Sequence, residues 1–125
     1  MERELVGREL LDAAIKVHSA LGPGLLESAY EACLAHELQG RNVAVKRQVV
    51  QPIRYRDLKI DAGYRLDLLL DEQVVVEIKS VAAFNPVHEA QLLSYLRLGN
   101  YRLGYLLNFN VRRMRDGIKR MVNSV

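Results

Sequence analysis

Val74-Val75-Val76-Glu77-Ile78-Lys79-Ser80 is the stretch of sequence that decides the fold. Its three consecutive β-branched residues predict a buried strand, because branched side chains pack well on a pleated sheet. Glu77 and Lys79 follow at once, and their spacing of two residues places both charges on one face of that strand. Either that face is solvated and the pair is an ordinary salt bridge, or the protein buries charge because it uses it.

The composition is that of a single globular domain. The chain has 125 residues, of which 50% are hydrophobic and 26% are charged, which is enough for one core. A net charge of +3 is compatible with nucleic-acid binding but does not require it. Cys33 is the only cysteine, so no internal disulfide can form and a reducing compartment is expected. No stretch resembles a signal peptide or a membrane span, and we expect a cytoplasmic protein without a membrane partner.

Hydrophobic periodicity predicts a mixed sheet flanked by helices. Apolar residues at three- and four-residue steps predict helices, and alternation with a period of two predicts strands. Asp71-Glu72 is expected to form a tight turn that makes the valine strand an antiparallel partner of the strand before it, and Pro52 indicates an edge strand. The expected elements are helices over residues 2–20 and 25–40, strands over 43–49, 60–70 and 74–80, a helix between Asn85-Pro86 and Gly99-Asn100, a strand over 104–109 and a surface helix over 111–122. This order, ααβββαβα, predicts the α/β (α+β) fold class.

A second carboxylate, that of Asp67, lies on the strand that precedes the turn. The hairpin can bring Asp67, Glu77 and Lys79 together on one face. Burying unpaired charge costs several kcal/mol, and two adjacent carboxylates also repel each other. A divalent cation reverses the sign of this interaction, since hard oxygen ligands are those that Mg²⁺ prefers. Lys79 can then balance charge or stabilise a phosphoryl oxyanion. The alternative is a solvated face of weak salt bridges.

The predicted helix after the hairpin carries a row of polar residues. His88, Gln91 and Tyr95 are spaced by three and then four residues, so they share one stripe. A helix packed across the sheet can direct this row toward the carboxylates, where the Gln91 amide can orient a water molecule or a phosphate oxygen. The alternative is the exposed polar face of an ordinary amphipathic helix.

Four motifs in this order carry a family resemblance. They are Gly24-Leu25-Leu26-Glu27-Ser28-Ala29-Tyr30, Arg65-Leu66-Asp67, Glu77-Ile78-Lys79 and the segment from His88 to Leu96, HEAQLLSYL. Together they resemble the GxxExxY family, which is assigned to the PD-(D/E)XK nuclease superfamily, over about residues 4–122. The resemblance implies a restriction-endonuclease-like core with a mixed central β-sheet flanked by α-helices.

The resemblance also implies a metal site. Asp67 and Glu77 would be the main ligands, Glu27 would complete the set from the second helix, and the backbone carbonyl of Ile78 would contribute a further oxygen. Lys79 would be the catalytic lysine. The implied cofactor is Mg²⁺ or Mn²⁺.

Further positions match with one departure. Gln91 and Tyr95 are similar to the Q-x-x-x-Y motif of RecB-like nucleases, which supports the active site or contacts DNA, and His88 is a neighbour of this motif. The proline that gives the superfamily its name is absent, since Leu66 precedes Asp67.

The expected function is metal-dependent hydrolysis of nucleic-acid phosphodiester bonds, with DNA as the expected substrate and a homodimer as the expected assembly. Two alternatives stay open: a nucleic-acid-binding module with little catalysis, and an accessory protein that binds metal only for stability. The residues expected to contact nucleic acid carry positive charge or lie beside the site, and they are Arg65, His88, Arg112, Arg113, Arg115, Lys119 and Arg120.

Overall fold

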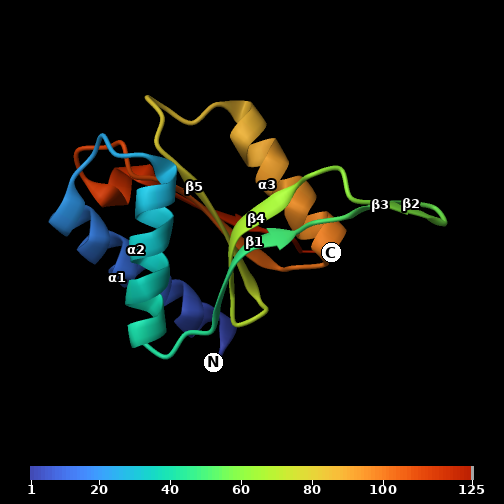
Figure 1. Ribbon diagram of the computed structural model, residues 1–125, viewed down its shortest axis with the longest axis horizontal. Helices are drawn as coiled ribbons and strands as arrows, with labels where there is room; N and C mark the ends of the chain where they lie inside the picture. Colours follow the sequence, from blue (N-terminus) through green and yellow to red (C-terminus); the bar gives the residue numbers. More distant parts are fainter. Residues whose placement is uncertain (125) are drawn as a thin grey trace.

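The computed structural model describes residues 1–124 and shows a five-stranded sheet with helices on both faces (Figure 1). The helices α1 (Arg3–Leu21) and α2 (Glu27–Gly40) lie together on one side, and α3 (Pro86–Gly99) lies on the other. The strands of the sheet, in spatial order, are β1 (Val45–Val50), β4 (Arg65–Leu70), β5 (Val74–Lys79), β6 (Leu103–Asn108) and β7 (Ile118–Val122).

The predicted α/β (α+β) fold class is confirmed. β5 pairs antiparallel with β4 through the turn at Asp71 and Glu72, as predicted, and both turn residues adopt positive φ. β5 then pairs parallel with β6, because α3 crosses over the sheet between them. β1 occupies one edge, as Pro52 indicated. This mixed sheet between helices is consistent with the restriction-endonuclease-like core that the resemblance implies.

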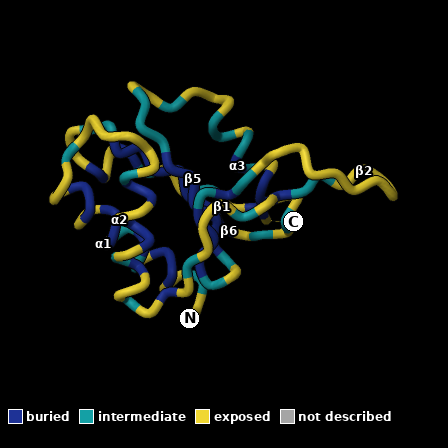
Figure 2. Tube along the Cα trace, in the orientation of Figure 1, coloured by how far each residue is buried: buried dark blue, intermediate teal, exposed yellow. Residues whose placement is uncertain are grey.

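The valine strand separates two hydrophobic cores. Val74, Val76 and Ile78 pack on the side of α1 and α2, whereas Val75 packs on the side of α3. Glu77 shares the parity of Val75 and is nevertheless only 4% exposed. Figure 2 shows the central strands as the most buried part of the chain. The carboxyl group of Glu77 is therefore buried. This excludes the alternative in which Glu77 lies on a solvated outer face of the sheet.

Local signals set the ends of α3. Asn85 caps the helix by accepting the N–H of Val87 at 2.7 Å, and Pro86 occupies the first turn. Asn100 ends the helix in the left-handed conformation. Within residues 1–124 no helix combines the length and the apolar character needed to cross a membrane.

The expected surface helix over residues 111–122 is wrong. Residues Met114–Gly117 form one short 3-10 turn, and Ile118–Val122 form β7, which pairs antiparallel with β6 from Leu103↔Val122 to Leu107↔Ile118. The secondary structure of residues 118–122 is set by their pairing with the buried strand β6. The periodicity of the local sequence carries no information about that pairing.

The expected strand over residues 60–70 is interrupted. Only Arg65–Leu70 belongs to the main sheet. Upstream, β2 (Ile53–Tyr55) and β3 (Leu58–Ile60) pair with each other and project from the body as an arm, residues 53–60 (Figure 1).

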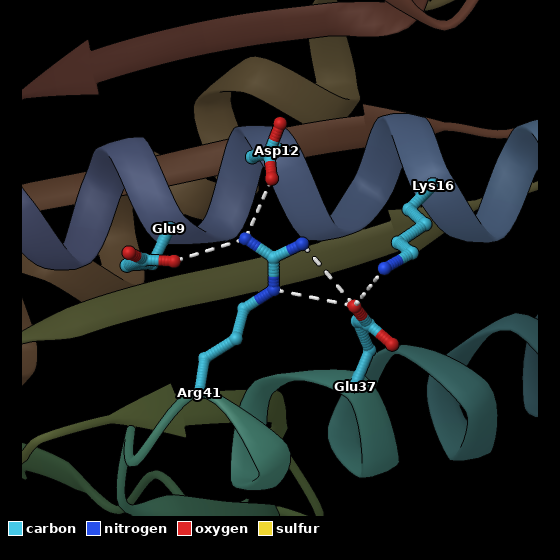
Figure 3. Close-up of polar contacts among 5 residues, drawn as sticks. All are labelled: Glu9, Asp12, Lys16, Glu37 and Arg41. Atoms are coloured by element: carbon cyan, nitrogen blue, oxygen red, sulfur yellow. Dashed lines mark hydrogen bonds and ion pairs between the residues drawn. The ribbon is translucent and has the colours of Figure 1, made fainter.

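Arg41, the residue directly after α2, links α2 to α1 through ion pairs (Figure 3). Its guanidinium forms ion pairs with Asp12 at 2.6 Å and Glu9 at 3.0 Å on α1, and with Glu37 at 3.2 Å on α2. The hydrogen bonds that Arg41 donates to these carboxylates raise its pKa, so its charge is permanent. The network fixes how α2 lies against α1.

Candidate functional site

Asp67 and Glu77 lie where the ladder between β4 and β5 opens. Main-chain pairing runs from Leu70↔Val74 to Leu68↔Val76. At the next position the side chains replace it: the N–H of Asp67 donates to Glu77 Oε2 at 2.8 Å, and the N–H of Ile78 donates to Asp67 Oδ2 at 2.7 Å. Each carboxylate is thus held by the opposite strand. The structure brings together the two acids that the sequence predicted.

This arrangement is electrostatically unfavourable for two bare anions. Burial, and after it the charge of Asp67, raises the pKa of Glu77 to about 8. Burial also raises the pKa of Asp67, although the N–H of Ile78 and the amide of Gln48 oppose that shift. Near neutral pH Glu77 therefore keeps its proton unless further positive charge is bound beside the pair.

Lys79 supplies part of that charge. It is half-buried at the end of β5, and its ammonium lowers the pKa of both Asp67 and Glu77. The main chain around it is fixed, because its carbonyl accepts the N–H of Phe109 at 3.0 Å. The next residue, Ser80, donates its hydroxyl to the carbonyl of Leu25 at 2.8 Å, which joins the end of β5 to the loop before α2.

A third carboxylate, Glu31 on α2, comes from a residue that the sequence did not single out. Glu31 is 6% exposed, and its charge raises the pKa of both Asp67 and Glu77. It accepts hydrogen bonds from Arg47 at 3.0 Å and from Gln48 at 2.5 Å.

Tyr30 fixes the helix turn that presents Glu31. Its ring stacks on Phe109 with centroids 4.4 Å apart. Its hydroxyl donates to the carbonyl of Gly22 at 2.5 Å and accepts the N–H of Leu25 at 3.1 Å. The aromatic residue of the G-x-x-E-x-x-Y string therefore anchors the loop before α2.

Gln48 links Glu31 to Asp67. Its side-chain nitrogen also donates to Asp67 Oδ1 at 3.3 Å, so one amide lies between the two carboxylates. Gln48 has φ 52, a left-handed conformation that is strained for a residue with a side chain. It lies opposite Asp67 in β1, between the pairs Arg47↔Leu68 and Val49↔Leu66. Strain of this kind is typical of functional sites.

Helix α3 contributes Tyr95 and Gln91 from the other face of the sheet. Tyr95 is 5% exposed, and burial, with the charge of Glu77 as a further cause, raises its pKa to about 12. Its ring lies edge-on to Tyr64 at 6.0 Å. Gln91 and Tyr95 line a pocket of about 440 Å³, together with Tyr64 and the base of the arm. His88 instead serves the helix cap, where Nδ1 accepts the N–H of Asn85 at 3.2 Å.

The donors fit a divalent cation. Carboxylate oxygens are the ligands that Mg²⁺ prefers, and Mg²⁺ commonly binds through one or two carboxylates while keeping several waters. Asp67 and Glu77 provide such a pair, and the Gln48 amide shows where a positive group is favoured between Glu31 and Asp67. In the part of the chain that the structure describes, no three His, Cys, Asp or Glu residues are grouped closely enough to hold an ion by themselves.

The place of Glu27 in the metal site stays a prediction. Glu27 lies exposed in the first turn of α2, one helical turn before Glu31. The spacing of four residues puts both on one side of the helix, so the sequence could have identified Glu31 as an equal candidate. For Gln48 no sequence signal exists, because its backbone conformation depends on the pairing of β1.

The basic residues expected to bind nucleic acid fall into two groups. Arg65, Lys119 and Arg120 form ion pairs with neighbouring carboxylates, at 3.1 Å with Asp61, 3.0 Å with Glu89 and 2.9 Å with Glu4. The others follow β6 in an exposed loop beside His18, and they are Arg112, Arg113 and Arg115. Whether either group contacts nucleic acid stays a prediction.

Comparison with known proteins shows the family of the chain. The family model of the PD-(D/E)XK nuclease superfamily matches residues 4–121. Comparisons with curated proteins and with solved structures found no significant match. The match covers nearly the whole chain and includes the acid pair, the lysine and the flanking helices. The chain belongs to the PD-(D/E)XK nuclease superfamily.

Proposed function

We propose that this protein is a metal-dependent nuclease that hydrolyses phosphodiester bonds in DNA. The observation that carries the proposal is the pair Asp67–Glu77, in which each carboxylate accepts an N–H from the opposite strand and the pKa of Glu77 is raised to about 8. A cation bound beside such a buried pair offsets the free-energy cost of ionising both carboxylates. Proteins of this superfamily typically use divalent metals, and Mg²⁺ or Mn²⁺ suits these oxygen donors.

Asp67, Glu77 and the main-chain carbonyl of Ile78 would hold the cation. When bound, the cation would lower the pKa of a water molecule and offset charge on the phosphate. Glu31 is buried and its charge raises the pKa of both Asp67 and Glu77, so it would support the acid pair from α2 without completing the ligand set.

The remaining groups orient and balance charge. Lys79 offsets negative charge as water adds to phosphorus and the ester bond breaks. Tyr95 keeps its proton, since its pKa is raised to about 12, so it acts as a hydrogen-bond donor and not as a base. Gln91, from the same pocket, orients a water molecule or a phosphate oxygen.

Within the superfamily we assign the chain to the GxxExxY group. The string from Gly24 to Tyr30 supports this assignment, and so does the anchoring role of Tyr30. In this chain the acidic residue of the string, Glu27, is exposed, and the glutamate after the tyrosine, Glu31, reaches the site.

A cleavage panel tests the proposal. Wild type should cut labelled DNA with Mg²⁺ or Mn²⁺ and not with chelator, on one or more of single-stranded, double-stranded and branched substrates. Lys79→Ala should lower the rate about a hundredfold or more, since it removes a charge that stabilises the transition state. Lys46→Ala, on the exposed start of β1, is the matched control. Paired cuts in both strands of a duplex would support the expected homodimer.

One observation favours a second candidate, a nucleic-acid-binding protein with little catalysis. The carboxylate of Glu31 is already engaged by Arg47 at 3.0 Å and by Gln48, which weakens it as a ligand. Wild type that binds DNA yet never cuts with either metal would establish this candidate and remove the first.

A further inference from the structure

The arm, residues 53–60, is a two-stranded ribbon outside the main sheet. β2 and β3 pair antiparallel over Ile53↔Ile60, Arg54↔Lys59 and Tyr55↔Leu58. Figure 2 shows most of the arm as exposed. An isolated two-stranded ribbon is marginally stable in water. An element of this kind that projects from the body is therefore a candidate for contact with another molecule.

The two faces of the arm differ in chemistry. Ile53, Tyr55, Leu58 and Ile60 alternate onto one face, and three of them are more than 40% exposed: Tyr55 64%, Leu58 53% and Ile60 42%. The other face carries Arg54 and Lys59 directly opposite each other. Like charges in directly opposed positions destabilise a strand pair.

The cations of the arm have no acidic partner. Among residues 1–124, Arg54, Arg56 and Lys59 take part in none of the ion pairs. The nearby carboxylate of Asp61 is engaged by Arg65 at 3.1 Å and by the N–H of Gly63 at 2.9 Å. Arg56, in the turn, lies 5.4 Å from the centre of the Tyr55 ring. With Asp57 as its one acid against these three cations, the arm carries a net positive charge beside an exposed aromatic ring.

The base of the arm lines the same pocket as Gln91 and Tyr95, two residues of the candidate site. Ile53 and Tyr64 form one wall of the 440 Å³ pocket, and Gln91 and Tyr95 on α3 form the other. Tyr95 is close enough to Glu77 for the carboxylate to affect its pKa. The arm and Tyr95 thus share one pocket on the α3 side of the sheet.

We infer that the arm binds a single-stranded segment of nucleic acid, with Arg54, Arg56 and Lys59 on the phosphates and Tyr55 stacked on a base. Charge complementarity selects a polyanion. The exposed apolar face favours single-stranded over double-stranded nucleic acid. In a single strand the faces of the bases are open to stacking, whereas in a duplex they are covered by their neighbours. The inference rests on the proposed function, since it assigns the form of substrate that reaches the acid pair.

Binding measurements test the inference without cleavage. All proteins carry Glu77→Gln and are titrated without divalent cations against labelled oligothymidine of about 20 nucleotides, longer than the binding site expected for so small a domain. The arm variant is Arg54→Gln/Arg56→Gln/Lys59→Gln. The matched control is Arg8→Gln/Lys16→Gln/Lys46→Gln, which removes the same charge from exposed positions on α1 and β1.

The arm variant should bind more weakly and lower the slope of log Kd against log salt by about 2, because each lost phosphate contact on a single strand contributes about 0.7. The control should leave that slope unchanged. Tyr55→Ala should weaken binding about fivefold or more, and Tyr55→Phe should restore it. A blunt duplex should bind more weakly than the single strand.

Three results would overturn the inference. One is an arm variant that behaves as the control does, and another is a duplex that binds as tightly as the single strand. The third is a wild-type dimer in sedimentation that Leu58→Gln dissociates, because the apolar face would then be an interface between two copies of the chain. Binding through the arm by a protein that never cuts would support this inference and remove only the proposed activity.

Discussion

The main-chain N–H of Asp67 donates to the carboxylate of Glu77 at 2.8 Å, and the carboxylate of Asp67 accepts the N–H of Ile78 at 2.7 Å. This exchange lets two acids lie in the gap between β4 and β5, and among residues 1–124 no lysine or arginine forms an ion pair with either one. Its cost appears in the pKa of Glu77, which burial and Asp67 raise to about 8.

The metal-free protein should lose stability as the pH rises from about 4.5 through about 8. Glu77 ionises at its ordinary value of 4.5 when unfolded and at about 8 when folded, so the folded state holds the extra proton in between, and raising the pH favours unfolding. Glu77→Gln should remove this loss and be more stable than wild type at pH 8, by on the order of a few kcal/mol. Denaturant unfolding in chelator at pH 5 and pH 8 measures it, with the exposed Glu72→Gln as control. Equal pH dependence of wild type and Glu77→Gln would contradict the buried charge.

Glu31 should matter for the site and Glu27 should not. Glu31→Gln should weaken Mn²⁺ binding and slow cleavage about tenfold or more, as is usual when a group that supports metal ligands is changed. Glu27→Gln, one helical turn away and exposed, should match wild type. Arg47→Gln separates the loss of the ion pair with Glu31 from the loss of the carboxylate. A larger effect at Glu27 would restore the assignment made from sequence.

Gln48 should act as a positioning residue, and two variants separate its backbone from its side chain. Gln48→Gly removes the strain at φ 52, whereas Gln48→Ala keeps it. The glycine variant should therefore be more stable than the alanine variant by about 1 kcal/mol. Both lose the amide between Glu31 and Asp67, so both should weaken Mn²⁺ binding equally. Unchanged Mn²⁺ affinity in both variants would show that the amide has no role.

Arg41 should support the fold and leave the chemistry intact. Arg41→Gln breaks the contacts with Glu9, Asp12 and Glu37 shown in Figure 3. Because these pairs form a network joining α1 to α2, we expect a loss of about 1 kcal/mol in the free energy of unfolding. Mn²⁺ affinity of the folded variant should equal that of wild type. A large loss of affinity would mean that the position of α2, and with it Glu31, depends on this network.

Local signals explain which parts of the fold are predictable. The turn at Asp71 and Glu72, the Asn85 cap and the Asn100 stop are encoded within a few residues, and each was predicted from sequence. The C-terminal segment failed for the opposite reason. Met114, Ile118 and Met121 recur at helical spacing, yet Ile118–Val122 pairs with β6, and this long-range register has no local signature.

The site residues also fall into those that local sequence predicts and those that depend on contacts between distant parts of the chain. Asp67, Glu77 and Lys79 could be grouped because a tight turn joins their strands. The choice between Glu27 and Glu31 depends on how far α2 is inserted against the sheet, which Tyr30 and Phe109 set through a contact between distant parts of the chain. The arm was missed because its pairing is confined to residues 53–60 and leaves hydrophobic side chains in water.

Calorimetric titration of Mn²⁺ at pH 7, in two buffers of different ionisation enthalpy, tests the central claim most directly. If a cation makes the pairing of Asp67 with Glu77 favourable, binding must displace the proton that Glu77 holds by virtue of its pKa of about 8. We predict the release of roughly one proton per bound ion in wild type and none in Glu77→Gln, with weaker binding in the variant. Binding without proton release, equally tight in both proteins, would contradict the account.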